Sequence, residues 1–159
     1  MGTSTNIIIG AATVTVNGSD VGYTMGGTTI RYEPEVRDIF ADQELGVVRK
    51  SRTAERMYVV TTLLEITLSQ LRMAFMIPHA QLSGSTHLTL GYSDACWVEE
   101  SLLVLSGKSP GCGTRTFTFN KVTTLNSKEY NMTREEETAF EVEFECLKSG
   151  GSFGNIVDS

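Results

Sequence analysis

The sequence predicts a mainly β protein, a β-sandwich or partly closed barrel with one flanking α-helix and a long protruding hairpin loop. Three observations support this fold class. Short segments rich in β-branched or alternating apolar residues recur along the chain, glycine-rich turns separate them, and only the stretch after Thr67 has helical spacing. The 159 residues, 40% hydrophobic and 20% charged, fit a single domain spanning residues 1–159.

The first strands are predicted before residue 66. Residues 11–16 are β-branched and end at Asn17-Gly18, a strong turn dipeptide. Residues 28–41 alternate between apolar and charged side chains, which predicts a long, half-exposed strand. Residues 57–65 form a nearly continuous apolar run, typical of a strand covered on both faces. In the alternating strand the apolar face comprises Ile30, Tyr32, Val36 and Phe40, and the charged face Arg31, Glu33, Glu35 and Arg37.

A single helix is predicted after residue 66. Thr67 and Gln70 form a capping box, and Ile66 and Leu71 are spaced as a hydrophobic staple. Pro78 ends the helical pattern. The stripe expected to face the sheet is Leu68, Leu71 and Phe75.

Four more strands are predicted after the helix, at residues 87–92, 101–106, 114–122 and 138–147. The last alternates most regularly, so one of its faces belongs to the core and the other is acidic and exposed to water. The core face comprises Phe140, Val142, Phe144 and Cys146, and the acidic face Glu141, Glu143 and Glu145.

Three segments are expected to lie outside the strands. Residues 1–9 form an N-terminal arm, and the Gly- and Ser-rich residues 148–159 a flexible C-terminal tail. Residues 42–56 are too many for a tight turn and are interpreted as a protruding loop. This loop carries Arg49, Lys50, Arg52 and Arg56.

The sequence contains no recognisable catalytic, cofactor or metal site. His79 and His87 have no nucleophile placed beside them, and Gly107-Lys108-Ser109 lacks the upstream glycine of a phosphate-binding loop. The glutamates lack the loop pattern of a calcium site, so we expect no bound metal and no cofactor. Cys96, Cys112 and Cys146 leave one thiol without an intrachain partner, and disulfides between subunits remain an open alternative.

Charge and hydropathy exclude other classes. The formal net charge of −6 disfavours tight nucleic-acid binding, which needs cationic side chains to neutralise phosphates. Apolar runs are far shorter than the roughly 20 residues of a membrane-spanning helix, so membrane insertion is not expected. The N-terminus shows no secretory pattern, which predicts a protein made in the cytoplasm.

Several segments together resemble the bacteriophage major tail tube protein family. They are residues 17–35 with Asp42, Gln43 and Gly46, residues 62–65 leading into the helix, and residues 138–147. The resemblance implies a β-sandwich with a flanking helix that assembles into hexameric rings. The rings stack head to tail into a hollow tube that conducts the genome into the host cell. It also implies a virion protein that is not an enzyme, is assembled in the host cytoplasm and contacts other tail proteins: a tape measure, a baseplate or tip, a terminator and, in contractile tails, a sheath.

Two sets of residues receive a role under this resemblance. The loop at residues 42–56 would reach a neighbouring ring, with its basic side chains meeting acidic ones. Acidic strand faces would line the bore, so that the genome passes without specific binding. The inter-ring set is Arg49, Lys50, Arg52, Arg56, Glu135, Glu136 and Glu137, and the bore set Glu33, Glu35, Glu141, Glu143 and Glu145.

Other functions stay open at this point. The tube protein of a related contractile injection device would share the fold. A small ligand-binding β module would need a pocket with convergent polar groups, which the sequence does not reveal. An enzyme is the remaining class, and no sequence feature favours it.

Overall fold

The computed structural model describes residues 12–65, 67–75, 77–91, 98–124, 129–130, 132 and 138–159. Several expectations lie outside these residues: the N-terminal arm at 1–9, the staple residue Ile66, the end of the strand predicted to Tyr92, Cys96, and the acidic run Glu135, Glu136 and Glu137.

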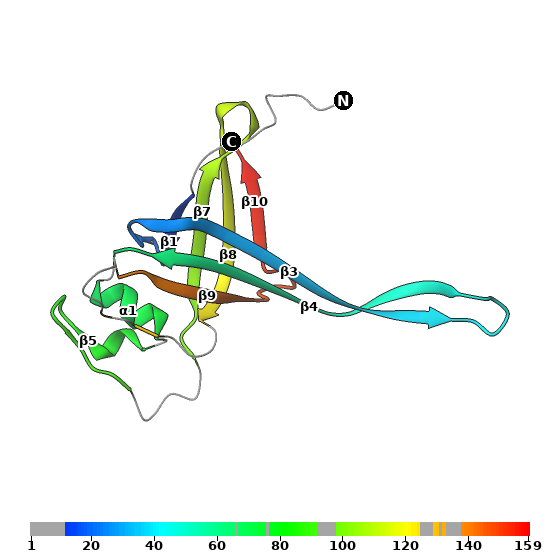
Figure 1. The fold of residues 1–159 in the computed structure, drawn as a ribbon, viewed down its shortest axis with the longest axis horizontal. Helices are drawn as coiled ribbons and strands as arrows, with labels where there is room; N and C mark the ends of the chain where they lie inside the picture. Colours follow the sequence, from blue (N-terminus) through cyan, green and yellow to red (C-terminus); the bar gives the residue numbers. More distant parts are fainter. Residues whose placement is uncertain are drawn as a thin grey trace.

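The described residues form a mainly antiparallel β structure with one α-helix, as predicted (Figure 1). Eight strands make one sheet in the order β2-β1-β7-β8-β9-β4-β3, with β10 also paired to β8. The strands are β1 (Thr13–Val16), β2 (Ser19–Asp20), β3 (Thr24–Phe40), β4 (Val47–Leu63), β7 (Ser101–Lys108), β8 (Thr114–Thr124), β9 (Phe140–Leu147) and β10 (Gly154–Asp158). Shorter elements are β5 (Leu82–Ser83), β6 (His87–Leu88), η2 (His79–Gln81) and η3 (Pro110–Cys112).

The sheet changes direction at β8, because two different strands, β10 and β9, pair with successive parts of β8. Residues 115–119 of β8 pair with β10, whereas residues 121–124 pair with β9. In Figure 1, the antiparallel strands β7, β8 and β10 therefore lie along one axis, and β3, β4 and β9 cross that axis. Both groups contribute to one hydrophobic cluster, including Leu103 and Phe119 from the first and Val59, Phe140 and Phe144 from the second. The alternation predicted for β9 is confirmed, since Phe140, Val142, Phe144 and Cys146 are all buried.

The first turn and the helix cap follow the sequence closely. Asn17 and Gly18 both have positive φ, 50° and 79°, as a two-residue hairpin turn requires. Helix α1 (Leu68–Ala74) has the predicted capping box, in which Thr67 and Gln70 exchange hydrogen bonds between side chain and backbone.

The predicted helix stripe is correct only for Phe75, which packs against the hydrophobic cluster with its ring 5.9 Å from that of Phe140. The buried residues of α1 are Gln70 and Ala74, followed by Ile77, whereas Leu68, Leu71 and Phe75 are only half-buried. The physical reason is that the Gln70 side chain donates a hydrogen bond to the carbonyl oxygen of Val21, which satisfies a polar group inside the body. A search for apolar periodicity passes over such a residue.

The structure corrects the predicted loop at residues 42–56. Residues from Val47 onward belong to strand β4, and only residues 41–46 form the turn. Strand β9 pairs with β4 between Met57 and Leu63 and no further. Between the Tyr32–Met57 pair and the turn, the β3–β4 hairpin therefore has no third strand beside it and extends away from the body (Figure 1). The predicted protrusion is present, as a two-stranded hairpin.

The C-terminal tail was also expected to be flexible, and the structure instead pairs it with the sheet. Strand β10 aligns with residues 115–119 of β8, and Arg115 donates two hydrogen bonds of 2.6 Å to the carboxylate of Asp158. Gly154 makes the approach feasible, because a side chain there would overlap the carbonyl oxygen of Thr118. Gly154, one of the glycines on which the prediction of flexibility rested, thus permits close packing.

Candidate interaction arm and acidic face

The part of the hairpin outside the body, residues 33–56, is here called the arm. Its apolar side chains have no core beneath them: Phe40 is 67% exposed and Leu45 is fully exposed. Val36, Ile39, Val47 and Val48 are exposed as well. An isolated two-stranded hairpin is at best marginally stable in water, and contiguous exposed apolar side chains mark interaction sites. The arm therefore has the properties of a segment that binds another surface.

The arm's charges are partly paired within the arm itself. Lys50 lies 2.9 Å from Asp38, and Arg52 lies 3.1 Å from Glu55. Arg37 and Arg49 make no ion pair among the residues that the structure describes. The sequence assigned the arm's basic side chains to acidic partners in another subunit. For Lys50 and Arg52, the arm itself already supplies a carboxylate partner.

Glu55 fixes the root of the arm. Its carboxylate accepts a 2.7 Å hydrogen bond from the Tyr32 hydroxyl and forms ion pairs with Lys148 and Arg52. Lys148 follows β9, so this cluster connects the body to the point where the arm leaves it. The hydrogen bonds from Lys148 and Tyr32 lower the pKa of Glu55 to about 2, which keeps it ionised over the physiological range.

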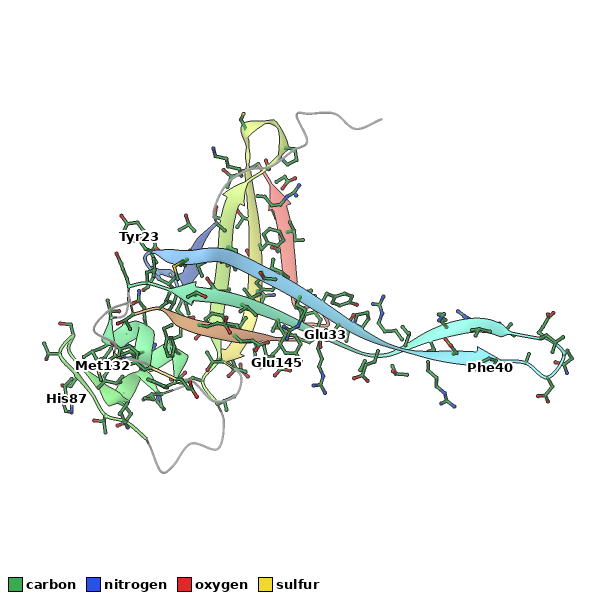
Figure 2. All side chains as sticks on the ribbon, viewed as in Figure 1. Tyr23, Glu33, Phe40, His87, Met132 and Glu145 are labelled. Atoms are coloured by element: carbon green, nitrogen blue, oxygen red, sulfur yellow. The ribbon has the colours of Figure 1, made fainter. Side chains whose placement is uncertain are left out.

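The strand register places the five predicted bore residues on one face. Arg31, Tyr58 and Glu145 face each other across β3, β4 and β9. Because residues two apart in a strand share a face, Glu33 and Glu35 join Arg31 on that side, and Glu141 and Glu143 join Glu145. Figure 2 labels Glu33 and Glu145 at the root of the arm. This surface, opposite the hydrophobic core, is called the acidic face below.

Two arginines lie within the acidic face. Arg31 forms ion pairs of 2.7 Å with Glu143 and 2.8 Å with Glu33, and its guanidinium lies 4.6 Å from the centre of the Tyr58 ring. A hydrogen bond with Tyr58, then the charges of nearby glutamates, raises the pKa of Arg56. Five carboxylates against two guanidiniums leave the face with a net negative charge.

A polar pocket, which the sequence did not reveal, lies between the β1–β2 turn and α1. Its volume is about 700 Å³, and its lining includes Asp20, Glu65, Arg72 and His79. These side chains come from separate segments, so no linear motif could have indicated it. The pocket is large enough for a small molecule.

Reactive groups elsewhere are sparse in the described part of the chain. No group of three or more His, Cys, Asp or Glu side chains is arranged to hold a metal there. Burial raises the pKa of the Cys146 thiol to about 12, so it stays protonated, whereas Cys112 is exposed. Among the same residues, no helix combines the length and apolar character needed to cross a membrane.

No family model and no curated protein matches this chain.

Proposed function

We propose that this protein is a structural subunit of a phage tail tube, in which hexameric rings stack into a hollow tube that conducts the genome. The observation that carries this proposal is the arm: a long hairpin with apolar side chains exposed beyond the body. A monomeric protein gains nothing from leaving such a surface uncovered, whereas a subunit that polymerises head to tail can cover it with the next copy.

The acidic face fits the wall of a conduit. A duplex that met basic side chains would bind through counterion release and stop, whereas carboxylates repel its phosphates and leave it mobile. The bore residues are Glu33, Glu35, Glu141, Glu143 and Glu145, which share one face of the sheet. In this proposal the protein is not an enzyme and contacts itself and other tail proteins in the virion.

Negative-stain electron microscopy of the purified protein tests the proposal. Rings or tubes of uniform diameter are expected at high protein concentration. The assembled protein should also fail to retain duplex DNA at moderate salt. A species that sediments as a monomer in several buffers, or a tight and salt-sensitive DNA complex, would refute the proposal.

The tube protein of a related contractile injection device is an alternative within the same class, and the same microscopy would reveal its rings. A ligand-binding module is a second candidate, favoured by the polar pocket of about 700 Å³. Its test is a thermal-shift screen of small anions and cations. A ligand that raises the melting temperature of wild type, but not of an Arg72→Gln variant, would favour the module.

A further inference from the structure

A second uncovered apolar surface lies at the root of the arm. It is a groove of about 190 Å³ between the crossing strands, lined by Ile30 and Met57 on one side and by β8 and β10 on the other. Its aromatic and aliphatic lining on that side includes Phe117, Phe119, Phe153 and Ile156. The groove therefore opens directly onto the hydrophobic core.

The size and lining of the groove indicate its occupant. Small-molecule sites usually measure about 300–1,000 Å³ and contain a few placed polar groups. This groove is smaller, and only Asn155 among its lining residues has a polar side chain. It suits one large apolar side chain entering from outside, which would extend the core.

We propose that the groove of one copy receives the apex of another copy's arm, with Leu45 as the inserted side chain. This inference rests on the proposed function and names the surface that the arm contacts. Leu45 is fully exposed in the turn of residues 41–46, and Phe40 and Val47 flank that turn at the last paired positions of β3 and β4.

Charge complementarity supports this pairing. The apex turn, residues 41–46, carries Asp42 and Glu44 and no basic side chain, and neither carboxylate has an ion pair among the described residues. At the groove, the Lys148 ammonium lies 5.4 Å from the centre of the Phe153 ring. Lys148 is 45% exposed and forms an ion pair with Glu55, but an ammonium has three donors. The Lys148 ammonium can therefore also donate a hydrogen bond to an apex carboxylate of another copy.

The apex cannot fill the groove of its own chain. Ile30 and Met57 lie on the same continuous strands as the apex, ten residues from the last pair, Phe40 and Val47. At roughly 3.3 Å per residue, the apex is held about 33 Å from its own groove. The contact is therefore between copies. In the proposed tube it runs head to tail, from the apex of one copy to the groove of the next, and such heterologous contacts close into rings or propagate as filaments.

Disulfide trapping between copies tests the proposal. Two variants with one introduced cysteine each, Leu45→Cys and Ile156→Cys, are made in a background in which Cys96 and Cys112 are serine and the buried Cys146 is kept. They are mixed under assembly conditions and oxidised mildly. The matched control replaces Ile156→Cys with Val157→Cys, because residue 157 is also exposed on β10 but lies on the opposite face.

The expected result is a mixed disulfide dimer at least tenfold more abundant with cysteine at 156 than at 157. Circular dichroism confirms that each variant is folded before mixing. Tubes that form normally without a preferential 45–156 product overturn the groove assignment and leave the tube proposal intact. Absence of any assembly by the parent protein overturns both. Flotation of the parent with phosphatidylcholine vesicles that is lost in Leu45→Ser, without the 45–156 product, would overturn the groove assignment and assign the apex to a lipid surface.

Discussion

Removing the arm should separate folding from assembly. Glu35 and Ala54 face each other across β3 and β4, so an Asn-Gly turn can join them in place of residues 36–53. None of the residues that form the hydrophobic cluster lies in the deleted segment. The shortened protein should therefore fold, remain monomeric and leave the body unchanged.

The expected change in stability is small. The deletion removes five cross-strand pairs, each contributing roughly 0.2–1 kcal/mol. It also removes the cost of ordering the arm, which nearly cancels such gains in an isolated hairpin. We expect the free energy of unfolding to change by no more than about 1 kcal/mol.

Urea unfolding followed by circular dichroism measures the stability, and sedimentation velocity measures the assembly. Loss of assembly with unchanged stability is the predicted outcome. The interpretation of the arm as an interaction element fails if the deletion destabilises the monomer by several kcal/mol. It fails equally if the shortened protein still forms particles of wild-type size.

Three further perturbations test the body of the protein. Phe144→Ala should lower the free energy of unfolding by about 3–5 kcal/mol in urea titrations, since Phe144 is 1% exposed within the core. Glu55, whose pKa is lowered from 4.5 to about 2, contributes stability that is complete above about pH 4.5 and lost as the pH falls toward 2. The Glu55→Gln variant should lose this contribution to the pH dependence of stability, as measured by acid unfolding followed by circular dichroism. An acid-unfolding curve identical to that of wild type would refute the role of the carboxylate. Gly154→Ala should free β10 from β8, because the new Cβ overlaps the carbonyl oxygen of Thr118, and limited proteolysis should then cleave the C-terminus faster than in a Ser152→Ala control.

Local patterns predicted much of the body. The alternation of Phe140, Val142 and Phe144 with glutamates identified β9, and Thr67 with Gln70 identified the helix start, because each signal depends on neighbours in sequence. The same alternation in residues 28–41 identified β3. It also suggested that the apolar face was half-buried, but no core covers Val36 or Phe40. Periodicity reports which side chains share a face, and tertiary contacts decide whether that face is covered.

The remaining features depend on contacts between distant segments. Whether residues 47–56 are strand or loop is decided by pairing with β3, through bulges that realign the register at Glu35/Val36 and Ile39/Phe40. The Glu55 cluster and the groove bring together distant segments, in the groove as far apart in sequence as Ile30 and Ile156. Neither produces a linear motif. The acidic face was proposed strand by strand, and only the register shows that its five glutamates share one surface.

A helical reconstruction of the assembled protein by cryo-electron microscopy tests the central claim most directly. The account predicts a hollow tube whose bore is lined by the face carrying Glu141, Glu143 and Glu145. The arm should bridge to the next copy, and because it extends about 33 Å from the body, the repeat it spans should not exceed about 40 Å. A solid filament, a bore lined by other surfaces, or arms that point freely into solvent would contradict the account.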